Sequence, residues 1–307
     1  MNTLAVVLEE PHRLALRRLD LKPAGPDDVV VEVEWSGIST GTERLLWSGR
    51  MPPFPGMGYP LVPGYEAVGR VVEAGGQGQA RIGDRVFVPG SSNFIDARGL
   101  FGGSARTLIT PGSRVVKLPD SLDDSGILLS LAATAQHAIA GDRFPDLIVG
   151  YGTLGRLLHR LVVAHGAPAP TVWETNPARQ DGVAVHPDDD PRRDYSCICD
   201  ASGAVDLLDT LVGRLARSGE IVLAGFYEER LSFAFPFAFM KEARFRIAAE
   251  FRPDDLSTVI ALIESGGLTL DGLITHRRDV SEAQEAYSTA FGDPACLKMI
   301  LDWRNCT

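Results

Sequence analysis

Apolar residues recur with two different spacings along the chain, and the spacing changes near residue 122. Before it, short apolar blocks at residues 4–8, 29–35, 68–75 and 83–88 are separated by Gly, Pro and Asp. Short strands with such turn residues between them are typical of all-β units. The first 121 residues therefore predict a partly open β-barrel.

After residue 122 the spacing of the apolar residues is typical of helices that alternate with strands. Residues 125–140 carry Ile127, Leu128, Leu131 and Ala135 on one helical face. Strands are then predicted at residues 147–149, 171–174, 183–185, 195–200, 220–225 and 244–249. This alternation predicts a doubly wound parallel sheet over residues 122–267, so the fold class is α/β. The β patterns at 273–275 and 296–301 are expected to rejoin the first domain, which then includes residues 268–307.

The most informative stretch is residues 147–158, LIVGYGTLGRLL. Its apolar run leads into Gly150, Gly152 and Gly155, and the next residues have helical spacing. Strand, glycine turn and helix are the parts that bind a pyrophosphate: the first glycine allows the turn, the second admits the phosphates and the third permits close packing. The N-terminus of the helix then faces the negative charge. The alternative is a glycine turn in an ordinary α/β domain.

A carboxylate in the right place strengthens the nucleotide interpretation. The predicted strand at 171–174 ends in Glu174, about twenty residues past the glycine turn, where an acid accepts hydrogen bonds from the ribose hydroxyls and repels a 2′-phosphate. This position predicts NAD as the cofactor. Arg179 nearby is the opposing signal, because a basic residue there could accommodate the phosphate of NADP.

Composition narrows the class further. The net charge of −10 argues against a nucleic-acid partner or a polybasic membrane anchor. The chain has no apolar run of about eighteen residues, and Met1 leads directly into a predicted strand, so we expect neither a signal peptide nor a membrane span. Four cysteines are too few and too poorly spaced for a disulfide framework, and Cys197 and Cys199 point to opposite faces of one strand. The expected location is the cytoplasm.

Several short motifs together resemble the medium-chain dehydrogenase/reductase family over the whole chain. They are GYE at 64–66 before VGRVV at 68–72, GDRV at 83–86, AATA at 132–135, the glycine turn, DASG at 200–203 and LKMIL at 297–301. The resemblance implies a GroES-like catalytic domain and a Rossmann domain with a cleft between them. It places Thr134, Gly225 and Phe226 at the nicotinamide and Lys298 at the pyrophosphate. The cofactor-binding residues expected on all these grounds are Gly150, Gly152, Thr153, Leu154, Gly155, Glu174, Thr134, Ala201, Gly225, Phe226 and Lys298.

The departures from the zinc-dependent members of this family are informative. Those members use a cysteine, the histidine of a Gly-His-Glu motif and a third ligand, and they carry a cysteine-rich structural lobe. Here the corresponding positions hold Ser39 and Thr40, Tyr65 and the stretch at 131–133, and residues 89–104 contain no cysteine. Zinc needs three protein ligands at a catalytic site and four at a structural one. We therefore expect no metal.

One branch of the family matches more closely. Residues 37–69, with GTERLLW at 41–47 and MPPFPGMGYPLVPGYE at 51–66, resemble the 3-hydroxyethyl bacteriochlorophyllide a dehydrogenases of bacteriochlorophyll synthesis. This resemblance implies oxidation of the 3-(1-hydroxyethyl) group of a magnesium macrocycle to 3-acetyl, with NAD as hydride acceptor. The substrate is identified by the resemblance and not by composition or spacing.

Without zinc, hydrogen bonds and a proton acceptor must stabilise the alkoxide. Tyr65, Ser39 and Thr40 stand at the absent ligands' positions, and Tyr65 is the first candidate to face the substrate hydroxyl. A base role would need a large downward shift of its pKa from about 10; the alternative is a phenol that only fills space. Glu66 either relays a proton or, as favoured here, pairs with Lys298.

Two further candidates have structural alternatives. Glu43 follows a glycine turn, where a carboxylate usually makes a cap or a loop hydrogen bond. His137 lies one helical turn beyond Thr134 and is either a relay or, as favoured here, a satisfied half-buried histidine.

The segment at 36–63 is long for a connection inside a compact domain, which usually indicates function. Its Met51, Phe54, Met57 and Tyr59 could form the wide apolar mouth that a flat chlorin needs, because methionine adapts to irregular surfaces. The alternative is a loop that packs on its own domain. Arg44 and Arg50 flank it and could pair with a propionate, and Arg50 is included among the expected substrate contacts.

Three functional classes remain open at this point. The first is a zinc-independent, NAD-dependent alcohol dehydrogenase acting on a bacteriochlorophyllide. The second is a zinc-independent NAD(P)H-dependent reductase of quinones or enones, which the same fold supports. The third is a dinucleotide- or pigment-binding protein without turnover. The apolar stretch at 226–239 also suggests a homodimer.

Overall fold

The structure is a computed structural model that describes residues 1–53, 55–76, 80–119 and 122–306. The chain forms two compact units, which we call the β unit (residues 1–130 and 271–307) and the α/β unit (residues 131–270). The sequence placed the first boundary nine residues earlier. The difference arises because the 3-10 helix η1 (Asp124–Leu128) packs on the strands of the β unit, with Ile127 and Leu128 fully buried.

The β unit contains a four-stranded and a seven-stranded sheet within the described residues. The smaller sheet has the order β2-β1-β4-β7, formed by β1 (Asn2–Glu10), β2 (Arg13–Asp20), β4 (Leu61–Val62) and β7 (Arg98–Gly99). The larger has the order β15-β16-β3-β5-β6-β9, with β8 also paired to β3. Its strands are β3 (Asp28–Ile38), β5 (Ala67–Ala74), β6 (Arg85–Val88), β8 (Thr107–Pro111), β9 (Val116–Lys117), β15 (His276–Asp279) and β16 (Met299–Asp302).

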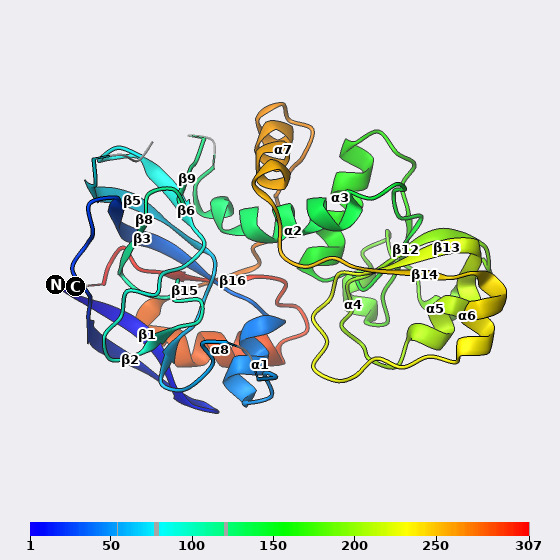
Figure 1. Cartoon of the computed structure of the whole chain (residues 1–307), viewed down its shortest axis with the longest axis horizontal. Coiled ribbons are helices and arrows are strands. Elements are labelled where there is room, and N and C mark those ends of the chain that lie inside the picture. The colour runs from blue at the N-terminus through cyan, green and yellow to red at the C-terminus, as the bar shows by residue number, and fades with distance from the viewer. Residues whose placement is uncertain (54, 77–79, 120–121, 307) are drawn as a thin grey trace. The chain divides into compact units, whose positions relative to one another are not determined.

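The C-terminal strands rejoin this unit, as predicted. β16 pairs antiparallel with β3, with Met299 opposite Ile38 and Asp302 opposite Trp35. The predicted strands at 273–275 and 296–301 begin about three residues too early, and β2 was not predicted. Helices α1 (Thr42–Ser48) and α8 (Ala283–Gly292) lie near each other beside β1 and β2, with η3 (Val280–Glu282) before α8 (Figure 1). The register of β16 on β3 places Lys298 beside the end of β3.

The α/β unit is a five-stranded parallel sheet in the order β11-β10-β12-β13-β14, so the predicted fold class is confirmed. Its strands are β10 (Leu147–Val149), β11 (Thr171–Trp173), β12 (Tyr195–Asp200), β13 (Leu215–Leu223) and β14 (Arg244–Ile247). Its helices are α2 (Leu129–Ile139), α3 (Thr153–Ala164), α4 (Pro177–Gln180), η2 (Pro187–Asp189), α5 (Leu208–Arg214), α6 (Phe235–Lys241) and α7 (Pro253–Glu264). Helices α5 and α6 lie side by side next to β13 and β14 (Figure 1).

The strand predicted at 183–185 is wrong as an element, because it is reduced to one parallel bridge between Trp173 and Val185. Asp181 and Gly182 both have positive φ, at 42° and 81°, which turns the backbone immediately before the segment. Val183 and Val185 are 44% and 39% exposed, so burial contributes little to extending the pairing. Between β11 and β12 the chain forms only the short helices α4 and η2 within the described residues.

The cysteines form no disulfide bonds among the described residues. Cys197, Cys199, Cys296 and Cys306 are free thiols, and burial raises the pKa of Cys197 to about 12. Among the described residues, no helix is both long enough and apolar enough to cross a bilayer.

Candidate active site

The glycine turn of the α/β unit links β10 to α3. Gly150 has a φ of +90°, and its main-chain N–H donates to the Trp173 carbonyl at 2.9 Å, which joins the turn to the neighbouring strand. A Cβ on Gly155 would lie 1.9 Å from the Gly150 carbonyl oxygen. The close packing of helix on strand therefore requires glycine at position 155.

The N-cap of α3 leaves open space beside the start of the helix. Gly152 is the N-cap of this helix, and a Cβ built there would meet nothing within 4 Å. The N–H groups of Thr153 and Leu154 belong to the first turn, whose donors have no acceptor within the helix. Such a turn combines N–H donors with the positive end of the helix dipole, which suits a phosphate group.

The turns after β12 and β13 meet the glycine turn at the carboxyl edge of the sheet. A Cβ on Gly150 would lie 3.0 Å from Ser202 Cα, and one on Gly225 would lie 2.9 Å from Gly203 N. The Ala201 N–H donates to the Val149 carbonyl at 2.9 Å. In open parallel sheets this edge is where nucleotides bind. Thr134, on α2, and Phe226, which is 51% exposed, are the other residues that the sequence assigned to the nicotinamide.

Glu174 follows β11 and faces the glycine turn. Its Oε2 accepts from the Tyr151 N–H at 3.0 Å, and its Oε1 accepts from the Asn176 N–H at 2.8 Å. The carboxylate is 8% exposed. Because each carboxylate oxygen can accept a second hydrogen bond, these contacts leave acceptor capacity while they fix the side chain beside the turn.

Asp200, which the sequence used only as part of a motif, proves to be a buried anchor of the same edge. Its Oδ1 accepts from the Ser202 N–H at 2.8 Å and hydroxyl at 2.6 Å, and its Oδ2 accepts from the Tyr227 hydroxyl at 2.8 Å. Burial raises the pKa of Asp200. The side chain joins the turns after β12 and β13. Its place at the end of an apolar strand was the available signal.

In the β unit, six polar side chains form what we call the polar cluster. Its members are Ser39, Glu43, Tyr65, Glu66, Tyr287 and Lys298. The Tyr65 hydroxyl donates to Ser39 Oγ at 2.7 Å, so two residues at absent zinc-ligand positions contact each other. Burial and the nearby Glu66 charge raise the pKa of Tyr65 above its usual value. The phenol therefore stays protonated at neutral pH. Thr40, next to Ser39, is exposed.

Glu43 lies at the start of α1 and is completely buried. Its Oε1 accepts from the Ser39 N–H at 3.0 Å, which is the loop hydrogen bond expected at this position. Its Oε2 accepts from the hydroxyl of Tyr287 at 2.6 Å. Tyr287, on α8, was not predicted, because no local pattern relates a helix 244 residues away to this loop.

Glu66 and Lys298 form the buried ion pair that the sequence favoured, with side chains 1% and 2% exposed. Lys298 Nζ also donates to the Ile38 carbonyl at 3.4 Å. Burial raises the pKa of Glu66 and the Lys298 charge offsets part of this rise. Glu66 Oε1 has no hydrogen-bond partner among the described residues. The ammonium is thus held by Glu66, and its predicted approach to a pyrophosphate stays a prediction.

The donor set at the family's zinc position does not suit zinc. It consists of a hydroxyl and a phenol that bond to each other, whereas catalytic zinc sites use thiolate, imidazole and carboxylate donors. The described residues contain no group of three His, Cys, Asp or Glu side chains that could hold a metal. His137 Nδ1 lies 2.9 Å from Asp255 Oδ2 and donates to this carboxylate, so His137 is the satisfied half-buried histidine that the sequence favoured.

The predicted substrate loop packs partly on its own domain. Met51, Met57 and Tyr59 are partly buried against a small cluster formed by Leu8, Leu46, Leu61 and Leu100. Phe101 packs on this cluster, and its ring meets Tyr65 edge-on with centroids 5.6 Å apart. The loop side chains thus adjoin a surface that continues to Tyr65. Phe54 lies outside the described residues. Arg50 is exposed, and its Nε donates to Ser48 Oγ at 3.3 Å.

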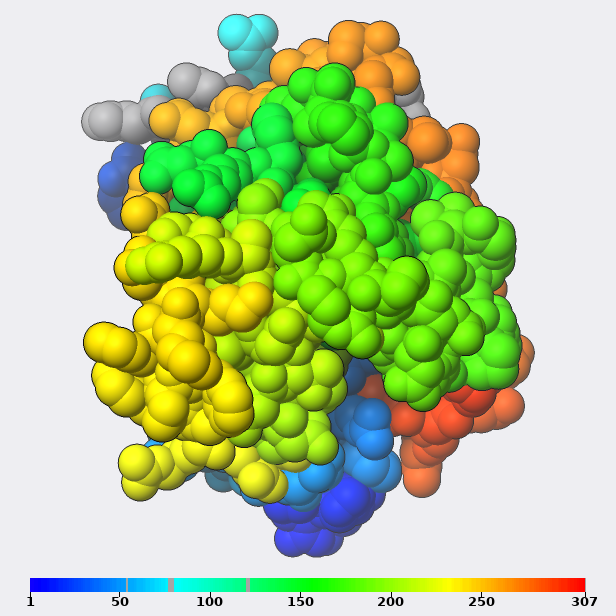
Figure 2. Space-filling model, turned by 90° about the vertical axis from the view of Figure 1, so that its right-hand side faces the viewer, coloured from blue at the N-terminus to red at the C-terminus, as the bar shows by residue number. Residues whose placement is uncertain are grey.

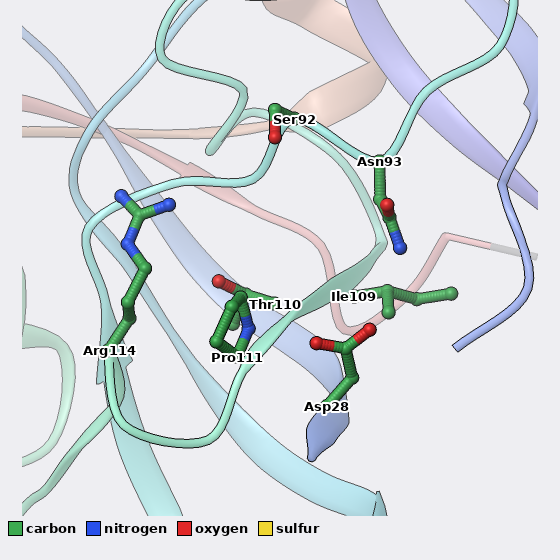
Figure 3. Close-up of a pocket in the computed structure, with 7 residues that line it drawn as sticks. All are labelled: Asp28, Ser92, Asn93, Ile109, Thr110, Pro111 and Arg114. Carbon is green, nitrogen blue, oxygen red and sulfur yellow. The ribbon is translucent and has the colours of Figure 1, made fainter. Parts of the chain in front are cut away.

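A cavity of about 170 Å³ elsewhere in the β unit is not part of this site (Figure 3). Asp28 and Arg114 lie on opposite sides of Pro111 in that view, and none of the predicted site residues lines the cavity. The cavity is also far smaller than a drug-sized ligand site of about 300–1,000 Å³.

Together, a parallel sheet with a glycine turn and a β unit with a buried polar cluster define a two-domain dehydrogenase architecture. Residues 25–120 match the model of the alcohol dehydrogenase GroES-like domain. The chain is 58% identical to the 2-desacetyl-2-hydroxyethyl bacteriochlorophyllide A dehydrogenase of Rhodobacter capsulatus, over 99% of each chain. The chain belongs to the medium-chain dehydrogenase family, within the group that contains this relative.

Solved structures show the same fold. An alcohol dehydrogenase from Escherichia coli CFT073 in complex with NADH superposes with a TM-score of 0.85 at 19% identity, over 98% of this chain and 99% of that one. A dehydrogenase from Sinorhizobium meliloti 1021 bound to NADP gives 0.80 at 20% identity, with the same coverage. These structures contain either dinucleotide, so the fold likeness leaves the choice between NAD and NADP open.

Proposed function

We propose that this chain oxidises the 3-(1-hydroxyethyl) group of a bacteriochlorophyllide to 3-acetyl, with NAD as hydride acceptor. The observation that carries the proposal is the 58% identity, over nearly the full length of both chains, to a relative named for that substrate. The expected step belongs to bacteriochlorophyll synthesis, and the expected location is the cytoplasm.

The α/β unit supplies the features that a nicotinamide dinucleotide needs. The N-terminal turn of α3 would hold the pyrophosphate, with Gly152 leaving room for it. Glu174 would accept from the ribose hydroxyls, and its charge opposes a 2′-phosphate. The bound nicotinamide supplies the hydride acceptor. Arg179 lies in the last turn of α4, close in sequence to Glu174, and it is the charge of Glu174 that favours NAD over NADP.

In this proposal, side chains of the β unit form hydrogen bonds to the substrate oxygen in place of zinc. The Tyr65 phenol, fixed by its hydrogen bond to Ser39, contacts the hydroxyl that loses its proton. A positioned donor or acceptor at the reacting oxygen does the work that a Lewis acid does in the zinc enzymes. Lys298, which pairs with Glu66 and bonds to the Ile38 carbonyl, joins the residue before β16 to the end of β3.

The apolar side chains beside Tyr65 suit a flat macrocycle. Met51, Met57, Tyr59 and Phe101 surround one small apolar cluster and remain partly exposed. Methionine and aromatic side chains form adaptable apolar surfaces for ligands of this kind. Arg50, which is exposed, would pair with a propionate of the macrocycle.

An anaerobic assay tests the proposal. Purified protein, 3-hydroxyethyl bacteriochlorophyllide and NAD should give equal amounts of NADH and 3-acetyl product, seen as a shift of the long-wavelength absorption band. Turnover with NADPH and a quinone, but none with the chlorin, would favour a reductase of activated double bonds. Binding of the chlorin without any NADH would favour a carrier.

We also propose that a second copy of the chain covers the outer edge of the sheet. β14 ends the sheet order, so one side of this strand faces away from β13. Beside it, four apolar side chains of α6 are 60–68% exposed: Phe235, Phe237, Phe239 and Met240. The α6 segment, yellow in Figure 2, lies on the surface of that view. Sedimentation should give a dimer, and Phe237→Glu should give a monomer; a monomeric wild-type chain would reject this.

A further inference from the structure

The two main-chain groups of Tyr151, in the middle of the glycine turn, are bonded by side chains of opposite charge. The Tyr151 N–H donates to Glu174 Oε2 at 3.0 Å. The Tyr151 carbonyl accepts from Arg156 Nε at 3.2 Å, and the guanidinium also lies over the Tyr151 ring, with Cζ 4.2 Å from the centroid. Arg156 belongs to α3, and its side chain is 12% exposed. The turn is therefore held by one anion and one cation.

The same guanidinium is bonded to the segment that follows Glu174. Its Nη2 donates to the Arg179 carbonyl at 2.9 Å, and its Nη1 bonds to the carboxylate of Asp181. Arg179 lies in the last turn of α4, where main-chain carbonyls have no donor within the helix. Because the guanidinium is planar and rigid, it fixes α4 and the glycine turn in one arrangement.

The α4 segment in turn holds Glu174. Gln180 Nε2 donates to the Glu174 carbonyl at 2.8 Å, and the Asn176 N–H donates to Glu174 Oε1 at 2.8 Å. The hydrogen bonds thus form a closed ring, which runs from Arg156 through the α4 segment to Glu174 and returns through Tyr151. Removing the Arg156 guanidinium opens this ring on two sides.

The bond to the Tyr151 carbonyl also decides where the next N–H points. This carbonyl and the Gly152 N–H belong to one planar trans peptide, so they point in opposite directions. With the oxygen held by Arg156, the Gly152 N–H points away from the guanidinium. Within the described part of the chain this N–H has no hydrogen-bond partner, and a Cβ on Gly152 would meet nothing within 4 Å. An unused donor beside the start of a helix suits a phosphate oxygen.

We propose that Arg156 is a positioning residue for the dinucleotide, an inference that rests on the proposed function. It holds the Tyr151 carbonyl so that the Gly152 N–H donates to the pyrophosphate. It holds α4 so that Glu174 accepts from the ribose. The guanidinium acts through these groups and does not contact the cofactor, because two carbonyls, the Asp181 carboxylate and an aromatic ring already occupy it.

Binding measurements on the full chain test this without the chlorin. Arg156→Met removes every donor and should weaken NADH, followed by its fluorescence, and ADP-ribose, followed by calorimetry, about tenfold each. The two losses should be equal, because ADP-ribose keeps the pyrophosphate and the adenosine ribose and lacks only the nicotinamide. Arg160→Met is the matched control on α3, since Arg160 bonds to the Thr269 carbonyl and not to the turn. It should leave both affinities within about twofold of wild type.

Arg156→Lys separates the geometry of the group from its charge. Lysine keeps the charge, but its ammonium lacks the planar fork that reaches both carbonyls, so the affinities should resemble those of Arg156→Met. Asp181→Asn keeps both carbonyl bonds and should change the affinities by less than about threefold. Wild-type affinity in Arg156→Lys, or a clear gain of affinity in Asp181→Asn, would mean that the positive charge attracts the phosphates directly. Either result overturns the inference.

Hydrogen–deuterium exchange of the ligand-free chain provides a structural measurement. In Arg156→Met, the main-chain amides at 150–154 and 176–181 should exchange faster than in wild type, because the ring of hydrogen bonds is open. Arg160→Met should exchange as wild type does in both segments. Weaker binding by Arg156→Met with unchanged exchange would indicate a direct contact with the cofactor and overturns the positioning role.

Steady-state kinetics separate this inference from the proposed function. Arg156→Met should raise KM for NAD about tenfold with kcat unchanged, because the lost positioning affects ground state and transition state alike. A fall in kcat at constant KM for NAD overturns the inference. If wild type binds NADH but does not oxidise the chlorin, the proposed reaction fails, and the affinities of the variants still decide the role of Arg156. If wild type binds no dinucleotide, both proposals fail.

Discussion

The glycine turn of the α/β unit and the polar cluster of the β unit are built from different kinds of groups. The turn is built from main-chain groups that are close in sequence, and it depends on the absence of side-chain atoms at Gly155. The cluster is built from side chains that are far apart in sequence, such as the bonded pair Glu43 and Tyr287, 244 residues apart, and it depends on burial and charge compensation. The glycine turn is therefore encoded by a short stretch of sequence, whereas the polar cluster is assembled by tertiary packing.

The largest effect is expected where a buried charge loses its partner. Lys298→Met leaves Glu66 unpaired inside the β unit and should reduce the free energy of unfolding by about 3–5 kcal/mol, measured by denaturant titration. Without the cation, the folded-state pKa of Glu66 lies further above its unfolded value. The folded state of the variant then binds more protons than its unfolded state. The loss of unfolding free energy should therefore grow as pH rises above the unfolded-state pKa of Glu66, and it should shrink at acid pH.

Two further variants test whether burial of the unpaired charge causes this loss of stability. Lys298→Met combined with Glu66→Gln should recover much of the lost stability, since no buried charge remains. Lys117→Met, which breaks an exposed pair with Asp84, should change little. A similar loss for Lys117→Met and Lys298→Met would contradict the role of burial.

A side chain in the glycine turn should destabilise it through a steric clash. Gly155→Ala places a Cβ 1.9 Å from the Gly150 carbonyl oxygen and should cost about 1–3 kcal/mol of stability and weaken NAD binding. Gly213→Ala is the matched control, because this helical glycine has nothing within 4 Å of its Cβ position and should gain stability. Equal behaviour of the two variants in thermal unfolding would mean that the turn tolerates a side chain.

A smaller effect is expected on the choice of cofactor. Glu174→Gln removes the charge that opposes a 2′-phosphate, and the ratio of kcat/KM for NAD to that for NADP should fall about tenfold. Asp181→Asn, at a carboxylate that instead pairs with Arg156, should leave the ratio nearly unchanged. An unaltered ratio in Glu174→Gln would remove this residue from the basis of the NAD assignment.

The smallest effect is expected at the apolar surface beside Tyr65. Met57→Ala removes a partly buried side chain and should raise KM for the chlorin about fivefold, or about 1 kcal/mol, while KM for NAD stays constant. Steady-state kinetics with each substrate varied in turn will measure this. A change in KM for NAD alone would place the loop outside the chlorin site.

The amino-acid sequence was enough to predict the two kinds of domain and the glycine turn at the carboxyl edge of the parallel sheet. Residues 147–155 predict strand, turn and helix because hydrophobic period and glycine position act over a few residues. The return of the C-terminal strands and the Glu66–Lys298 pair also followed from the pattern, the second with help from the family resemblance. The predicted strand at 183–185 failed because exposure and a left-handed turn outweighed its apolar composition.

The surroundings of Glu43, by contrast, depend on contacts between distant parts of the chain. Tyr287 reaches it because α8 packs beside β2, and Lys298 lies beside the end of β3 because β16 pairs with that strand in one register. Neither arrangement leaves a local signal, since side-chain contacts between distant segments depend on how whole elements pack. The same packing excludes water from Glu43, and it is this burial that changes an ordinary loop carboxylate into a group that titrates near neutrality.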